Sequence, residues 1–238
     1  MKNLHLLFIF SILLSVQEAR AINKMVVGAD DRQQITRKNK TNIHESIGMI
    51  FYKSRDGYTY YCTGTVIGPR HVVTAAHCIE SASTDYYFMP GNISKPFINV
   101  EYRLPRKAIK SLVGIPFPGF STDTATKTDV GIIIFPEDLK VPELPLKVSE
   151  HISENVTITG YPTDKPQGTM WEDSGLMTNG QYQLDTFGGQ SGSAVRNDQD
   201  EIIGIHSHSI RSKRINYACL LTQEHIDFLE KFIRQHRR

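Results

Sequence analysis

Most of this 238-residue chain consists of short segments rich in valine, isoleucine, threonine and tyrosine, each bounded by glycine, proline, asparagine or aspartate. Examples are SIGMIFYKS, CTGTVIGP, HVVTAAHC, DVGIIIF, NVTITGYP and EIIGIHSHS. β-Branched and aromatic residues fit pleated strands, and the bounding residues favour turns. Because no helical pattern separates most of these segments, they favour a β-barrel or β-sandwich over alternating strands and helices.

One helix is predicted, at the C-terminus. Thr222 can cap it, and Ile226, Leu229, Phe232 and Ile233 recur at steps of three and four, which makes one apolar stripe for docking on the β-structure. Residues 109–124 hold turn formers and little periodicity. We expect them to form a long connection between two halves of the molecule.

The N-terminus has the pattern of a secretory signal peptide. A basic start precedes the apolar run LHLLFIFSILLSV, and Ala19-Arg20-Ala21 offers a small-x-small cleavage site. Residues 1–21 are therefore predicted to be removed, which predicts a secreted, extracellular protein. An uncleaved membrane anchor is the alternative, although the run is short for a bilayer. No later segment is apolar enough to cross a membrane, so no membrane contact is expected of the mature form.

The charge pattern argues against a nucleic-acid-binding protein. Three of the 27 basic residues and one of the 25 acidic residues lie in the first 24 positions, which leaves a balanced mature chain. Such a chain has no global basic field. Asn39, Asn92 and Asn155 fit the glycosylation acceptor pattern, which matters only if the source glycosylates secreted proteins.

Three cysteines, Cys62, Cys78 and Cys219, can form one disulfide in a secreted protein and leave one thiol. The sequence alone allows all three pairings.

Three segments carry the residues for nucleophilic catalysis. GTVIGPRHVVTAAHC ends in His77 and Cys78, TKTDVGIIIF holds Asp129, and FGGQSGSAV holds Ser191. A serine hydroxyl needs a base within hydrogen-bond reach, and the base needs an orienting partner. The order His, Asp, Ser resembles the chymotrypsin-fold serine proteases. This resemblance implies an all-β fold of two antiparallel six-stranded β-barrels with a C-terminal α-helix, over residues 25–238.

The resemblance narrows to the glutamyl endopeptidases, which cut after glutamate. GADDRQQIT, GYPTDKPQGTMW and DTFGGQSGS are similar to segments of that family, and the similarity covers essentially the whole mature chain. It implies a triad of His77, Asp129 and Ser191, and an oxyanion hole made by the backbone N–H groups of Gly189 and Ser191. It also implies a Cys62–Cys78 disulfide, with Cys219 as a buried free residue. The chain departs from the family pattern at Ser209, where glycine is usual, and at Ala194, where proline is common.

Two features of the sequence disagree about substrate specificity. Asp185 lies six residues before Ser191, the spacing at which trypsin-like enzymes hold the aspartate that selects arginine or lysine. Thr186 and His206 instead match the residues that recognise the glutamate carboxylate in glutamyl endopeptidases, and a histidine suits an acidic substrate. We expect cleavage after glutamate and less often after aspartate. Basic specificity set by Asp185 is the alternative.

His206 and His208 could share one strand face and suggest zinc, but no convincing third ligand lies nearby. No metal and no cofactor are expected. A catalytically silent binding protein on a protease fold is a third alternative, against which the complete set of catalytic residues argues.

Gln190 predicts the mode of activation. It carries no charge, so it cannot form the ion pair that a new N-terminus makes in trypsin-like zymogens. The glutamyl endopeptidase resemblance places the mature terminus at Met25, where the freed amine helps to bind the substrate carboxylate. We therefore expect a propeptide of residues 22–24 and an activating protease that cuts after Lys24. We also expect protein or peptide substrates, and a monomer.

Overall fold

The computed structural model describes residues 24–26, 28–53, 59–80, 85–93, 108–150 and 152–235. The predicted signal peptide, residues 1–21, lies outside the described residues, as do the first two residues of the predicted propeptide. Among the helices of the described part, none has the length and apolar character needed to cross a membrane.

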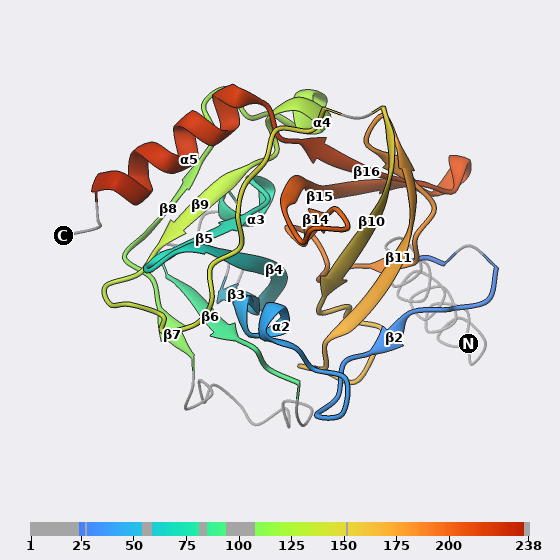
Figure 1. The fold of residues 1–238 in the computed structure, drawn as a ribbon, viewed down its shortest axis with the longest axis horizontal. Helices are drawn as coiled ribbons and strands as arrows, with labels where there is room; N and C mark the ends of the chain where they lie inside the picture. The colour runs from blue at the N-terminus through green and yellow to red at the C-terminus, as the bar shows by residue number, and fades with distance from the viewer. Residues whose placement is uncertain are drawn as a thin grey trace, which may run out of the picture.

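The first half of the molecule is a curled antiparallel sheet (Figure 1). Its strand order is β7 (Ile109–Lys110), β6 (Tyr86–Pro90), β3 (Ile47–Lys53), β4 (Thr59–Gly68), β5 (His71–Thr74), β9 (Gly131–Ile134) and β8 (Val113–Pro116). The central strands of this sheet do not show a simple alternation of buried and exposed residues, because both of their faces are covered.

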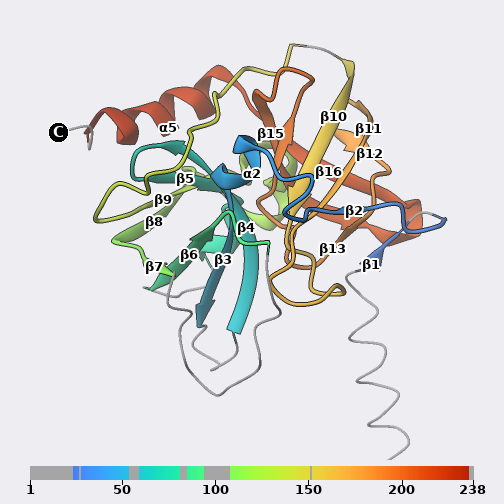
Figure 2. The same cartoon turned by 60° about the horizontal axis from the view of Figure 1, so that its bottom comes forward.

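The second half is a closed barrel. Its order is β10 (Ser153–Gly160), β14 (Ala194–Arg196), β15 (Ile202–Ile210), β16 (Ile215–Leu220), β12 (Gln181–Tyr182) and β11 (Trp171–Thr178), and a β10–β11 pairing closes the ring. β2 (Gln33–Gln34) adds to the free edge of β11. A separate pair joins β1 (Lys24–Met25) to β13 (Thr186–Phe187), as Figure 2 shows.

These sheets confirm the predicted all-β class with two antiparallel halves and a C-terminal helix. The second half has the predicted form, a closed barrel of six strands. The first sheet has seven strands, and no strand pair among its described residues closes it.

The prediction that residues 109–124 form the connection between the two halves is wrong. β7 and β8 lie in this stretch and belong to the first sheet, and β9 follows them. The chain passes between the halves later, between β9 and β10. Two strands of two and four residues, broken by glycine and proline, are too short to show a period of two.

The C-terminal helix α5 (Gln223–Gln235) has the predicted cap and stripe. The His225 N–H donates to Thr222 Oγ1 over 3.4 Å, and the Thr222 N–H donates to His225 Nδ1 over 3.1 Å. Ile226, Leu229 and Ile233 are buried, and Phe232 packs against the same core. This apolar face docks on the first half, which explains the helix's place along one side of the molecule in Figure 1.

The remaining helical turns are short and lie in connections. They are α2 (Asn42–Ser46), α3 (His77–Glu80), η1 (Thr122–Thr124), α4 (Ala125–Thr128) and η2 (Arg211–Lys213). Three buried clusters support the fold: one fills the first half and reaches α5, one fills the closed barrel, and one, including Tyr161 and Met170, lies where the halves meet.

Candidate active site

A cleft of about 540 Å³ brings together residues that are far apart in the sequence. Its walls come from α3, from the η1–α4 turn, from β13 with the loop that follows it, and from β15. The lining residues are His77, Phe120, Thr122, Ala125, Asp129, Thr186, Phe187, Gly188, Ser191, His206, Ser207, His208, Ser209 and Arg211. The three residues predicted to carry the chemistry therefore border one space.

His77 and Asp129 form a two-point contact. His77 opens α3, and Asp129 follows α4 just before β9. The His77 ring nitrogen Nδ1 lies 2.8 Å from Asp129 Oδ2, and the His77 backbone N–H donates to Asp129 Oδ1 over 2.9 Å. The second bond fixes the carboxylate relative to the helix that carries the ring. Nδ1 is therefore the ring nitrogen of His77 that faces Asp129.

Ser207, which the sequence analysis did not single out, adds a third contact. Its hydroxyl donates to Asp129 Oδ2 over 2.5 Å. Burial raises the pKa of a carboxyl, but the hydrogen bonds from His77 and Ser207 outweigh it and hold the pKa of Asp129 below its ordinary value. Asp129 is thus an anion at neutral pH, beside the imidazole that it orients.

The loop that carries Ser191 is anchored to β4. The Thr63 N–H donates to the Ser191 carbonyl over 2.8 Å, and Thr63 Oγ1 donates to the Gly189 carbonyl over 2.8 Å. Gly192 has φ +82°, and a Cβ there would lie 2.1 Å from Thr74 Oγ1. Only glycine allows the loop to sit this close to the first half.

The residues before Ser191 are held by their own hydrogen bonds. The Gln190 N–H donates to the Phe187 carbonyl over 3.1 Å, and the Phe187 N–H donates to Gln190 Oε1 over 3.0 Å. Gln190 is fully buried. The uncharged side-chain amide of Gln190 therefore stabilises this turn by a hydrogen bond, and not by an ion pair.

Both the backbone conformation and the surroundings of Gly189 require glycine at this position. Its φ is +97°, and a Cβ would lie 2.3 Å from the Tyr161 carbonyl oxygen. The glycine is required by the packing behind the loop, rather than to leave room on the substrate side. In the described part of the chain no group accepts a hydrogen bond from the N–H of Gly189 or of Ser191.

Thr186 and His206 both line the cleft that Ser191 borders, and both are buried. The Thr186 hydroxyl donates to Asn216 Oδ1 over 2.8 Å, and Ser209 Oγ donates to the same oxygen over 2.5 Å. Asn216 is fixed in turn by its Nδ2, which donates to the Leu184 carbonyl over 2.6 Å. Ser209, where the resembled family usually has glycine, thus turns its hydroxyl toward Asn216.

His206 is held by a buried tyrosine. The Tyr182 hydroxyl lies 2.5 Å from His206 Nδ1. Burial lowers the pKa of His206 to about 3, so the ring is neutral, and burial raises the pKa of Tyr182, so the phenol keeps its proton. The phenol donates to Nδ1, which puts the ring proton on Nε2. A neutral imidazole with an Nε2–H donor results.

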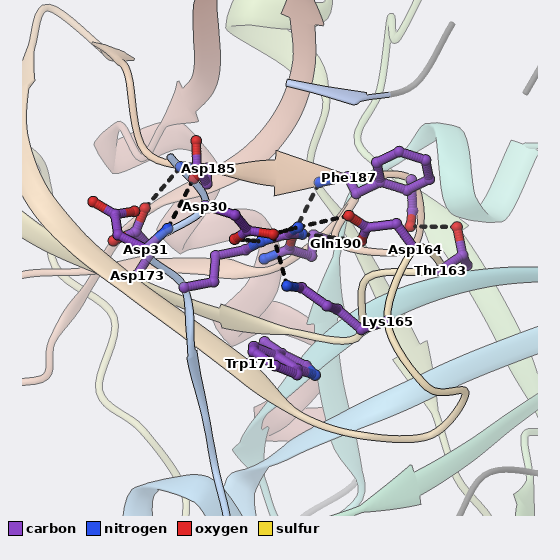
Figure 3. A network of polar contacts seen from close by, with 12 residues as sticks. Asp30, Asp31, Thr163, Asp164, Lys165, Trp171, Asp173, Asp185, Phe187 and Gln190 are labelled. Atoms are coloured by element: carbon purple, nitrogen blue, oxygen red, sulfur yellow. Dashed lines mark hydrogen bonds and ion pairs between the residues drawn. The ribbon is translucent and has the colours of Figure 1, made fainter. Parts of the chain in front are cut away.

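Asp185 is turned away from the cleft. Its carboxylate accepts the Asp31 N–H over 3.2 Å, and its own N–H donates to Asp173 Oδ2 over 2.7 Å. Figure 3 shows Asp185 grouped with Asp31 and Asp173. Asp185 is not among the residues that line the cleft. Its spacing from Ser191 is that of a pocket aspartate, but its side chain is not placed as one.

The predicted N-terminus pairs with the strand that carries Thr186. In the β1–β13 pair, Met25 stands opposite Thr186 and Lys24 opposite Phe187. This pairing brings residues separated by 161 positions into adjacent strands.

The Cys62–Cys78 disulfide is present, and Cys219 is buried and free. Burial raises the pKa of the Cys219 thiol to about 12, so it is unreactive at neutral pH. The two disulfide sulfurs lie near His77, but as a disulfide they offer no thiolate to a metal.

Comparison with known proteins gives a consistent result. A family profile described as Trypsin matches residues 35–224. A glutamyl endopeptidase of Staphylococcus epidermidis is 30% identical over 223 residues, which cover 88% of this chain and 73% of the relative. A glutamyl endopeptidase of Staphylococcus aureus strain MW2 is 28% identical over 237 residues, which cover 91% and 66%. Among solved structures, a Glu endopeptidase in complex with MPD is similar with a TM-score of 0.71, at 23% identity, covering 88% of this chain and 100% of that one.

Proposed function

The chain belongs to the trypsin family and is a serine endopeptidase, and we propose that it hydrolyses peptide bonds after glutamate, and less often after aspartate. The observation that carries this proposal is that His206 lines the cleft together with Thr186 while Tyr182 occupies its Nδ1, which makes Nε2 the ring nitrogen available to donate to a substrate. A secreted, extracellular location and action on protein or peptide substrates belong to the same proposal.

In this proposal His77, Asp129 and Ser191 act as the triad. His77 takes the proton of the Ser191 hydroxyl as the oxygen attacks the substrate carbonyl. The buried Asp129 anion holds the ring and stabilises its cation. The N–H groups of Gly189 and Ser191 donate to the oxyanion that forms. His77 then protonates the leaving amine, and water hydrolyses the acyl-enzyme.

Specificity for glutamate follows from the donors around the pocket. The Nε2–H of His206 gives one hydrogen bond to the side-chain carboxylate. The Thr186 hydroxyl can turn from Asn216 to the carboxylate at little cost, because Ser209 continues to donate to Asn216 Oδ1. An aspartate side chain is one methylene shorter and reaches this pair of donors less well, so its turnover is expected to be slower.

The alternative of basic specificity loses its main support. It requires Asp185 in the pocket, whereas the Asp185 carboxylate accepts a hydrogen bond from the Asp31 backbone. The silent binding protein has no specific support either, because His77, Asp129 and Ser191 all line one cleft.

A direct test compares matched peptides with Glu, Gln, Asp, Arg, Lys or Phe before a chromogenic leaving group. The protein begins at Met25, and Ser191→Ala is the blank. Fastest turnover after Glu supports the proposal, whereas fastest turnover after Arg or Lys contradicts it. Absence of turnover together with no Ser191-dependent fluorophosphonate labelling would indicate a silent binding protein.

We further propose that an activating protease cuts between Lys24 and Met25. The β1–β13 pairing places the Met25 backbone opposite Thr186, so a new α-amino group at Met25 would bring a positive charge to the carboxylate pocket. Protein beginning at Met25 should cleave glutamyl peptides faster than protein beginning at Ile22. Equal rates would contradict this role of Met25.

A further inference from the structure

A buried arginine ties the N-terminal segment to the second barrel at a point where no proposed catalytic residue lies. The Arg32 side chain has no exposed surface. Its Nε and Nη2 donate to Asp30 over 2.9 and 2.8 Å, and its Nη1 and Nη2 donate to Asp164 over 3.1 and 2.6 Å. The guanidinium thus bridges two carboxylates, a geometry that lysine could not reproduce.

Lys165 completes this group, which we call the ion cluster: Asp30, Arg32, Asp164 and Lys165. Lys165 Nζ donates to Asp30 Oδ2 over 2.6 Å and lies 4.2 Å above the ring of Trp171. Two positive and two negative charges balance. Figure 3 shows the cluster between the N-terminal segment and the loop that carries Thr163.

The residue next to the cluster contacts the catalytic loop. Thr163, adjacent to Asp164, donates twice to one carbonyl: its N–H reaches Gly188 O over 2.8 Å and its Oγ1 reaches the same oxygen over 2.9 Å. Both lone pairs of the Gly188 carbonyl are therefore directed at Thr163.

These two hydrogen bonds fix the orientation of the peptide group between Gly188 and Gly189. A peptide unit is planar and trans, so the carbonyl of Gly188 and the N–H of Gly189 point in opposite directions. While Thr163 holds the carbonyl, the Gly189 N–H points away from Thr163. Glycine on both sides of this peptide leaves its rotation weakly restricted by the chain itself.

We propose that Arg32 is a positioning residue for the oxyanion hole: by holding Asp164 and Asp30 together it fixes the Thr163 loop, and Thr163 orients the Gly188–Gly189 peptide. This inference rests on the proposed role of the Gly189 N–H. It makes the geometry of the loop that carries Ser191 depend on the N-terminal segment, which contacts the Thr163 loop through Arg32 and pairs with β13 through β1.

Single substitutions separate this role from simple support of the fold. Arg32→Gln and Asp164→Asn break the cluster. Thr163→Val removes only the hydroxyl donor of an exposed residue, and Thr163→Ser restores it. Lys147→Gln is the matched control, because it breaks an ion pair of 2.8 Å with Glu201 that contacts neither the cluster nor the cleft. Folding of each variant is checked by its thermal unfolding midpoint.

The first readout is the split between kcat and KM on the best substrate of the unsubstituted protein. Complete loss of an oxyanion donor lowers kcat by about 10²–10³-fold. Partial misorientation should therefore lower kcat about 10-fold in Arg32→Gln and about 3-fold in Thr163→Val. The KM of both variants should stay within about 2-fold of the unsubstituted value. Thr163→Ser and Lys147→Gln should retain the unsubstituted kcat.

The second readout is inhibitor affinity. A peptide aldehyde, whose adduct with Ser191 carries an oxyanion, should bind more weakly in step with the loss of kcat. The corresponding product peptide, which forms no tetrahedral adduct, should bind unchanged. If Arg32→Gln fails to fold, Asp164→Asn and Thr163→Val decide by the same comparison.

The inference is overturned if the folded variants keep kcat and aldehyde affinity, or if the control loses as much as they do. Failure of the proposed glutamate specificity appears elsewhere, in the substrate preference of the unsubstituted protein. If that protein cleaves none of the peptides, the rate of fluorophosphonate labelling of Ser191 replaces kcat and gives the same two outcomes.

Discussion

Replacing Tyr182 by phenylalanine should weaken glutamate recognition without altering the shape of the pocket. Tyr182 is buried, and its hydroxyl donates to His206 Nδ1 over 2.5 Å. Phenylalanine keeps the ring and removes the donor. A buried acceptor left without a partner costs about 1–3 kcal/mol, so the free energy of unfolding should fall by that amount.

The effect on specificity comes from the proton on the imidazole. In the unsubstituted protein the tyrosine places that proton on Nε2, where it can meet the substrate carboxylate. Without the tyrosine, the tautomer with a proton on Nδ1 becomes populated, and its Nε2 lone pair repels a carboxylate. Weakening this hydrogen bond to a charged group by about 1.5 kcal/mol lowers kcat/KM roughly 10-fold for peptides cleaved after Glu.

The assay measures kcat/KM on matched peptides with Glu or Gln before the scissile bond. Their ratio cancels any general loss of activity and should fall in Tyr182→Phe. Tyr161→Phe is the control, since it removes a buried hydroxyl that donates to the Ile47 carbonyl over 3.3 Å, away from His206. A Glu-to-Gln ratio that stays at the unsubstituted value in folded Tyr182→Phe would refute the proposed part of His206 in recognition.

Three further outcomes are expected. Burial lowers the pKa of His206 to about 3, so the ring is already neutral above pH 5. The Glu-to-Gln ratio of kcat/KM should therefore stay constant between pH 5.5 and 8. A fall in this ratio as the pH rises through about 6.5 would mean that recognition needs a charged His206. Gly189→Ala forces a Cβ to within 2.3 Å of the Tyr161 carbonyl at φ +97°, which costs about 1–3 kcal/mol of strain or moves the loop. Its kcat should fall about 100-fold, and a folded variant with normal kcat would contradict the assigned oxyanion donor. Replacing both Cys62 and Cys78 by alanine opens a loop with a sequence separation of 16 and should lower the free energy of unfolding by about 3 kcal/mol in urea titrations; an unchanged midpoint would speak against that contribution.

The parts of this protein that could be predicted from sequence are those whose signal is local. The segments around His77, Asp129 and Ser191 each carry a recognisable motif, and the structure places all three side chains on one cleft. The terminal helix was predictable because its buried residues repeat with the period of a helix over thirteen positions.

The parts that escaped prediction depend on partners far along the chain. Ser207 donates to a carboxylate 78 residues earlier, and Tyr182 meets a histidine 24 residues later on another strand. Neither residue stands out among its neighbours. Arg32 lies in a segment that reads as a loop, and its partner Asp164 is 132 residues away.

Asp185 shows why the spacing of a residue along the sequence does not by itself predict the residue's role. Its distance from Ser191 in the sequence fixes which part of the loop it occupies, but not which way its side chain points. The direction is set by the N-terminal segment, whose Asp31 N–H binds the Asp185 carboxylate, while Asp173 binds the Asp185 N–H. The same segment carries Arg32 and pairs with β13 at Met25, so it affects the walls of the pocket at several points. We therefore expect specificity in this chain to depend on how the N-terminal segment docks, as well as on the residues next to Ser191.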